Sequence, residues 1–318
     1  MRSLTGRTFF RLLLVVCVVG LSGSFVASAG ASQLIDRNAK QITLGVNNTG
    51  IAMVSFKAAG KVHHVLASGA INALPPTDGS QQVAFKLDYA GGWGFFHKMN
   101  YWKKFRNACA PYDGPALAWF VAGCTAPDGS YWALQKWQRM LPNYGLKPKA
   151  KQSVWELRLS HWDTDIPVLE IYLDWAYHEH FDHLFGVLTY NGDGVYGFGN
   201  TLYGNPTDSW GRNIFVDTYN SRYGKGWKRE NSFLTHKPAE GSDGTGGGFC
   251  YGFYPHKANG KMRPVGKGEK YRATVIGPGV TPDVFWQGTP VPYSEDLDAQ
   301  ANAKRLELIP DDSHCTSY

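Results

Sequence analysis

Short apolar and β-branched runs, separated by Asn, Gly and Pro, follow one another along the chain from residue 41 onward. Within residues 41–66, three such runs are separated by Asn47-Asn48-Thr49-Gly50 and by Gly60-Lys61. Asn and Gly adopt the positive φ values that tight turns require, so this spacing predicts antiparallel strands joined by hairpins. Asn191-Gly192-Asp193-Gly194, which separates residues 184–190 from residues 195–198, is another strong hairpin signal.

The same pattern predicts many further strands. We expect them at residues 82–88, 116–124, 131–141, 154–162, 168–177, 213–219, 231–236, 249–254 and 269–276. Many short strands at near-regular spacing, with few helices, indicate a mainly β protein. The predicted fold is therefore an antiparallel β-sandwich or jelly-roll-like body with one or two short helices.

Two segments have helical periodicity. Apolar residues between Phe95 and Cys109 recur at spacings of three and four, which predicts a short helix near residues 96–107. A second helix is expected near residues 294–309. Ser294 suits its N-cap, two acidic residues follow in its first turn, and basic residues lie near its end.

The N-terminus predicts a secretory signal peptide at residues 1–29. Three arginines precede an apolar run at residues 12–19, and the small residues Ala27-Ser28-Ala29 suit cleavage. No later run reaches about 18 apolar residues, so we expect no transmembrane segment in the mature chain and predict a secreted protein. A proline-rich loop then separates an N-terminal β-hairpin region, residues 30–76, from a main β-sandwich domain, residues 77–318.

Four cysteines follow the signal peptide: Cys109, Cys124, Cys250 and Cys315. An even number of cysteines in an exported protein indicates disulfide bonds, and four cysteines allow three connectivities. We favour Cys109 with Cys124, which would close a compact segment, and Cys250 with Cys315, which would tie the C-terminal tail to a strand.

The charge of the chain argues against a nucleic-acid partner. The formal net charge is +6, and loss of the three signal-peptide arginines leaves +3. The basic residues are scattered along the sequence, whereas a nucleic-acid surface needs a concentrated stripe.

Three stretches resemble segments of secreted bacterial proteins of unassigned activity. They are Gly226-Trp227-Lys228-Arg229-Glu230-Asn231, Phe249-Cys250-Tyr251-Gly252-Phe253 and residues 275–284. The resemblance covers about the C-terminal two-thirds of the chain. It implies secretion and a shared fold, and it transfers no catalytic residue.

The stretch Tyr177-His178-Glu179-His180-Phe181-Asp182-His183 is a candidate metal site. On a single strand, His178, His180 and Asp182 would share one face, with neighbours about 6.6 Å apart, close enough for imidazoles to converge on zinc. A further ligand would have to come from elsewhere. The candidates are His161, Asp174, His236 and His256. The alternative is a solvated polar strip at a strand end, with no metal or other cofactor.

Residues 213–231 alternate aromatic and polar side chains and form a candidate ligand-binding surface. Tyr219, Tyr223 and Trp227 could stack on sugar rings, while Arg229 and its basic neighbours could hydrogen-bond hydroxyl groups or accept acidic polymers. The alternative is a glycine-rich connection in which Trp227 fills the sandwich.

These patterns leave three functions open. The first is a non-catalytic module that binds polysaccharide or another cell-envelope polymer through Tyr and Trp. The second is a metal-dependent hydrolase centred on His178 and His180. The third is a structural surface protein with a protein partner. Nucleophile signatures such as Gly-x-Ser-x-Gly and His-Glu-x-x-His do not occur, so no catalytic residue is assigned.

Overall fold

The structure is a computed structural model. It describes residues 32–74, 83–89, 101–141, 153–176, 181–195, 199–200, 206–207, 219–220, 228–229, 248–252, 271–289 and 291–308. Every strand pair in these ranges is antiparallel, and the two helices are short, which confirms the predicted mainly β fold. No helix among the described residues is long and apolar enough to cross a membrane. The signal peptide lies outside these ranges.

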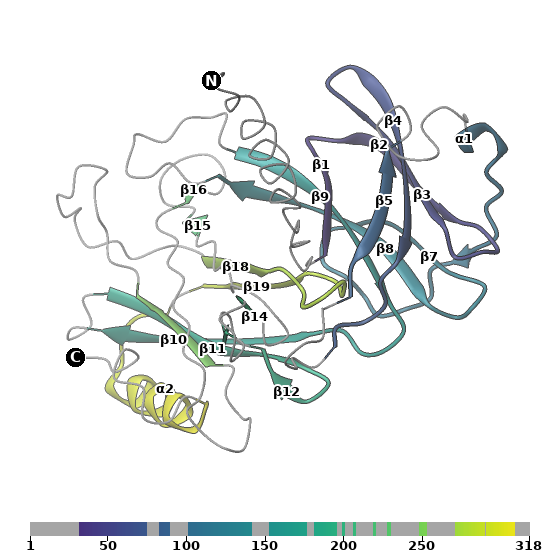
Figure 1. The fold of residues 1–318 in the computed structure, drawn as a ribbon. Coiled ribbons are helices and arrows are strands. Elements are labelled where there is room, and N and C mark those ends of the chain that lie inside the picture. The colour runs from purple at the N-terminus through teal and green to yellow at the C-terminus, as the bar shows by residue number, and fades with distance from the viewer. Residues whose placement is uncertain are drawn as a thin grey trace, which may run out of the picture.

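Two sheets pack face to face as the sandwich (Figure 1). Sheet A has the order β1-β9-β8-β7-β6, formed by Gln33–Arg37, Ser153–Trp162, Tyr131–Met140, Phe120–Thr125 and Ala110–Pro111. Sheet B has the order β2-β3-β4-β5, formed by Lys40–Val46, Ala52–Ala58, Lys61–Gly69 and Phe85–Tyr89. Buried side chains of both sheets form one core cluster, to which sheet B contributes Val54, Phe56 and Val65 and sheet A contributes Trp132, Leu134, Leu157 and Leu159.

The hairpins form where the turn residues predict them. Asn191 and Gly192 have φ values of 52° and 84°, and their neighbours Tyr190 and Asp193 pair directly. Two positive φ values in a two-residue loop match the twist of antiparallel strands, which explains why Asn-Gly is a reliable signal.

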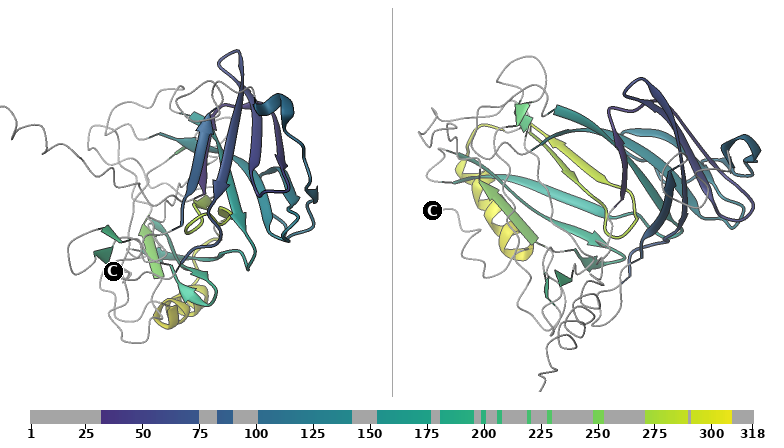
Figure 2. Two further views of the ribbon diagram at one scale, coloured as in Figure 1. Left: turned by 45° about the vertical axis from the view of Figure 1, so that its right-hand side comes forward. Right: turned by 45° about the horizontal axis from the view of Figure 1, so that its top comes forward.

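A second group of strands lies on the other face of sheet A (Figure 2). It contains β10 (Val168–Ala176), β11 (Phe181–Tyr190), β12 (Asp193–Gly194) and β17 (Gly248–Gly252), together with the hairpin of β18 (Tyr271–Val275) and β19 (Val284–Gly288). Ile171, Leu184 and Leu188 pack with Tyr271 and Val275 in a separate core cluster. Helix α2 (Glu295–Leu308) covers the opposite face of β10 and β11, where Phe185 contacts Ala301 and Leu308.

Several elements differ from the sequence-based expectation. Helix α1 comprises only Tyr101–Lys104, within the longer helix expected near residues 96–107. Strands β1 and β19 were not predicted. The remaining short strands are β13 (Gly199–Asn200), β14 (Pro206–Thr207), β15 (Tyr219–Asn220) and β16 (Lys228–Arg229). The strand predicted at residues 231–236 lies outside the described residues.

The predicted disulfide between Cys109 and Cys124 is present. It joins the segment that follows α1 to β7 of sheet A. That segment lies along the free edge of β2, because Asn107 Oδ1 accepts a hydrogen bond from the backbone N–H of Val46 at 2.9 Å and the Ala108 N–H donates to the Val46 carbonyl at 2.8 Å. Cys250 is on β17 and Cys315 lies outside the described residues, so their pairing stays a prediction.

Removal of this disulfide by the double substitution Cys109→Ser/Cys124→Ser should destabilise the protein. The cysteines are 15 residues apart, and a bond closing a loop of that length restricts the unfolded chain by about 3 kcal/mol. Urea unfolding measures the change. Cys109→Ser alone should cost as much as the double substitution, and an unchanged free energy of unfolding in both variants would contradict a stabilising role.

Candidate functional site

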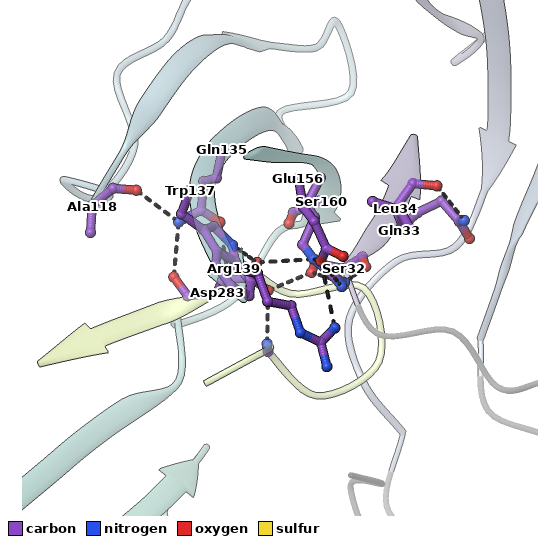
Figure 3. A network of polar contacts seen from close by, with 12 residues as sticks. Ser32, Gln33, Leu34, Ala118, Gln135, Trp137, Arg139, Glu156, Ser160 and Asp283 are labelled. Carbon is purple, nitrogen blue, oxygen red and sulfur yellow. Dashed lines mark hydrogen bonds and ion pairs between the residues drawn. The ribbon is translucent and has the colours of Figure 1, made fainter. Parts of the chain in front are cut away.

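A buried ionic network surrounds Glu156 on β9, whose exposed fraction is 0%. Three guanidinium groups reach its carboxylate: Arg158 at 2.7 Å, Arg37 at 3.1 Å and Arg139 at 3.7 Å. They converge because β9 lies between β1 and β8, and Glu156 is directly opposite Arg37 in the register. Figure 3 shows Glu156 within this network.

The network keeps Glu156 ionised in the protein interior. Burial alone would raise the pKa of Glu156, but the positive charges of Arg158 and Arg139 and the hydrogen bonds from Arg158 and Arg37 outweigh it. The resulting pKa lies below the ordinary value. A carboxylate held in this way accepts hydrogen bonds and organises cations, and is a poor proton donor or acceptor near neutral pH.

A second carboxylate, Asp283, fastens the loop between β18 and β19 to sheet A (Figure 3). The indole Nε1 of Trp137 donates to Asp283 Oδ2 at 2.6 Å, and the backbone N–H of Gly277 donates to Oδ1 at 3.1 Å. The hydroxyl of Ser32 also donates to Oδ1. Gln135 accepts from the Asp283 backbone N–H at 2.8 Å and donates to its carbonyl at 2.9 Å. Residues 275–284 are therefore positioned by a satisfied buried network.

An exposed aromatic side chain lies at the border of the Glu156 network. Trp155, next to Glu156 on β9, is 43% exposed. Asn38 fixes its backbone, because the Trp155 N–H donates to Asn38 Oδ1 at 3.0 Å and the Asn38 N–H donates to the Trp155 carbonyl at 2.7 Å. The Lys136 ammonium lies 6.0 Å from the indole centroid, and the Arg37 side chain is 44% exposed. Arg37 pairs with Glu156 on the other face of β9, so we call Asn38, Lys136 and Trp155 the Trp155 edge.

The described structure also contains a buried acid–histidine pair that sequence reasoning missed. Asp174 on β10 is directly opposite His183 on β11, and His183 Nδ1 hydrogen-bonds to Asp174 Oδ1. His183 is the last histidine of the histidine-rich stretch, and Asp174 was expected as a further metal ligand. Only the register of the β10–β11 hairpin shows that Asp174 and His183 are opposite each other.

Helix α2 brings another carboxylate to this pair. Asp174 Oδ2 and Asp298 Oδ1 are both buried without a hydrogen-bond partner. Burial raises the pKa of Asp298, and the negative charge of Asp174 raises it further. Hydrogen bonds from the Trp175 backbone and the Asn302 side chain offset only part of this effect. The contact between α2 and the β10–β11 hairpin therefore contains like charges.

The metal hypothesis is only partly addressed by the described residues. Asp182 is on β11, while His178 and His180 lie outside the described residues. Ala176 pairs with Phe181, so the chain reverses between them. Asp182 therefore lies on a different strand from residues 168–176, and the metal assignment of His178, His180 and Asp182 stays a prediction. No group of three metal-ligating side chains occurs within the described ranges.

Two of the proposed further ligands have other contacts. His161 Nδ1 contacts the Gly69 carbonyl at 3.1 Å and Nε2 contacts Ser130 Oγ at 2.9 Å, so both ring nitrogens are used inside the sandwich. Asp174 binds His183 as described above. His236 and His256 lie outside the described residues.

The predicted aromatic surface is described at two of its four residues. Tyr219 on β15 and Arg229 on β16 are register partners in an antiparallel pair, so the structure brings them opposite each other. Tyr223 and Trp227 lie outside the described residues. The sequence-based candidate set did not include Trp155, although its position in an alternating strand next to a charged residue was visible.

The chain matches no protein-family model, no curated protein and no solved structure.

The substitution Glu156→Gln should destabilise the protein by about 3 kcal/mol, because it leaves three guanidinium groups without their shared counter-charge. Since the folded pKa of Glu156 is depressed, its stabilisation is fully present above the ordinary pKa of 4.5 and is lost as the pH falls through the folded value. Urea unfolding near pH 7 should therefore show a large difference in free energy of unfolding between the variant and wild type, and near pH 3 this difference should be smaller.

Asp165→Asn, at an exposed carboxylate, is the control. Equal stability of Glu156→Gln and wild type near neutral pH would contradict the role of the network.

The substitution Asp298→Asn should raise the melting temperature near neutral pH. A carboxyl whose folded pKa is raised stabilises the fold only while it is protonated, and that contribution is lost as the pH rises. An amide removes the repulsion with Asp174, so the gain should vanish in acid. Differential scanning calorimetry as a function of pH measures it. Asp296→Asn, an exposed residue of the same helical turn, controls for the helix dipole and should give no gain. A lower melting temperature for Asp298→Asn at neutral pH would exclude like-charge repulsion.

Proposed function

We propose that this protein is a secreted, non-catalytic module that binds cell-envelope or environmental polysaccharide, with Trp155 as its principal stacking ring. The observation that carries the proposal is a half-exposed indole held on a rigid strand, with hydrogen-bonding side chains around it. Indoles with one wet face suit the apolar face of a sugar ring, and neighbouring amide and ammonium groups suit its hydroxyls.

Preorganisation distinguishes Trp155 from the other exposed tryptophan of the described residues. Trp102, which is 37% exposed, stacks on His64 with ring centroids 4.6 Å apart and planes 7° apart. The Lys103 ammonium lies 5.2 Å from the same indole centroid. One face of Trp102 is therefore covered by protein. Trp155 has no such ring partner in the described structure, and its backbone is fixed on both sides by Asn38.

The cross-strand pair of Tyr219 and Arg229 supports a second contact region of the same kind. Tyr223 and Trp227 belong to this part of the proposal. The competing functions are a metal-dependent hydrolase at His178 and His180 and a structural surface protein with a protein partner. The binding experiment below distinguishes them from the proposal, since neither requires affinity for a polysaccharide through Trp155.

The substitution Trp155→Ala should weaken polysaccharide binding by about tenfold or more, since loss of a stacking ring removes on the order of 1.5 kcal/mol. Affinity electrophoresis of the secreted protein against cellulose derivatives, chitin fragments, peptidoglycan and pectin measures it. Trp102→Ala is the matched control and should keep its affinity. The proposal is wrong if no polymer binds, or if Trp155→Ala binds as tightly as wild type.

A further inference from the structure

We propose that the outer face of sheet B, together with α1, is a second binding surface and that its ligand is a linear anionic polysaccharide. This surface is separate from Trp155 and Lys136, which lie on sheet A, so the inference goes beyond the proposed function. It comes from an excess of positive charge in one region of the sequence, which the strands place on one face of the molecule.

The basic residues are scattered along the sequence, but the carboxylates that offset them are scarce where sheet B and α1 form. Residues 38–112 contain eight lysines and arginines and two carboxylates, so their formal charge is +6. Without the three signal-peptide arginines the whole chain carries +3, so its remaining residues carry −3. A charge asymmetry of this size between two parts of one chain indicates a surface for a partner of opposite charge.

The strand register places these cations on the outer face of sheet B. Phe56 and Val65 point into the core, and side chains alternate between the two faces of a strand. Lys57 therefore points outward, and its direct register partner Lys40 shares that side. Lys86 on β5 points outward for the same reason. All three lysines are exposed.

Helix α1 adds further cations to the same face. Trp102 stacks on the outward-facing His64 with ring centroids 4.6 Å apart, so α1 lies against the outer face of sheet B. The Lys103 ammonium lies 5.2 Å from the Trp102 centroid. Lys104 and Arg106 follow in the chain, and both are exposed. Sheet B and α1 form the right-hand side of Figure 1, away from α2.

Negative charge is scarce on this face of the described structure. Residues 40–74, which contain β2, β3 and β4, have no Asp or Glu. On β5, Asp88 is opposite Leu66 and shares the outer face, with one of its carboxylate oxygens buried. No ion pair joins Lys40, Lys57 or Lys103 to a carboxylate of the described residues. Their ammonium groups are therefore available to an anionic partner.

The spacing of the cations fits an extended ligand. Lys57 is opposite Val62 and Lys86 is opposite Ser68, so six residues of β4, or about 20 Å, separate the two lysines along the sheet. Helix α1 lies between them, over His64. A small anion reaches only one of these groups, whereas a chain with an anionic group on each sugar reaches several at once.

Two other anionic partners fit this face less well. A membrane surface requires apolar side chains that enter the lipid, and Val62 and Trp102 are the exposed large apolar residues in the described parts of sheet B and α1. A single-stranded nucleic acid stacks its bases on open aromatic rings, whereas one face of Trp102 is covered by His64. A polysaccharide whose anionic groups project from a linear backbone requires only the lysines.

The test compares dextran sulfate with dextran, and polygalacturonate with its methyl ester, by isothermal titration calorimetry. At least one anionic polymer should bind about tenfold or more tightly than its neutral counterpart, and this preference should fall between about 50 and about 300 mM salt, because salt screens exposed charges. A preference in one pair alone would support the inference and identify the recognised anionic group. Trp155→Ala should keep the preference, which separates this inference from the proposed function. Equal affinities within both pairs would overturn it.

The diagnostic variant is Lys40→Gln/Lys57→Gln/Lys103→Gln. It should lower affinity for the preferred anionic polymer about tenfold, because several exposed ion pairs of modest strength are lost together. Its matched control, Lys40→Arg/Lys57→Arg/Lys103→Arg, keeps the three charges and should bind like wild type. Unchanged affinity of the glutamine variant would exclude this face as the site.

Acetylation of wild-type lysines, read by mass spectrometry, locates the site without a variant. Saturating anionic polymer should protect Lys40, Lys57 and Lys103 and leave Lys304 on α2 reactive. Protection of Lys304 to the same extent would contradict a site on sheet B. Phosphatidylglycerol vesicles or single-stranded DNA that bind as tightly as the anionic polysaccharides would assign the face to a membrane or a nucleic acid, and would also overturn the inference.

Discussion

Burial of one ionised carboxylate between three guanidinium groups is the interaction on which this structure depends. Glu156 lies on β9, an interior strand of a five-stranded sheet, and the arginines that reach it come from three adjacent strands. The desolvation cost of such a charge is large, so the group is tolerated only when its partners are complete. The alignment of β1, β9 and β8 is thereby linked to a single side chain.

The same sheet connects the two halves of the molecule. One of its faces completes the apolar core of the sandwich, and the other holds Asp283 and the β18–β19 loop. The network also determines which neighbouring side chains are exposed. Burial of Glu156 points the side chain of the adjacent Trp155 to the other face of β9, where it is half-exposed. Arg37 is held with part of its side chain in solvent. An exposed ring held on a rigid strand is a consequence of the core, and this is the feature that the proposed polysaccharide site uses.

Local rules predicted much of the fold. Turn residues located the hairpins, alternation located most strands, and capping located α2 within one residue of each end. Long-range pairing was not predictable, because β1 meets β9 across more than a hundred residues and no local pattern encodes that partner. The acid–histidine pair of Asp174 and His183 and the three arginines around Glu156 depend on such register. The histidine-rich stretch suggested a metal site because its groups are near in sequence, and His178 and His180 lie outside the described residues.

The most direct test of the account is the pKa of Glu156, measured by carbon-detected NMR titration of the side-chain carboxyl in the folded protein. Three guanidinium groups should hold this pKa below the ordinary value of 4.5 despite full burial. A pKa at or above 4.5 would mean that burial outweighs the arginines. The network would then not be the ionic centre around which the sheet, the loop and the Trp155 edge are built.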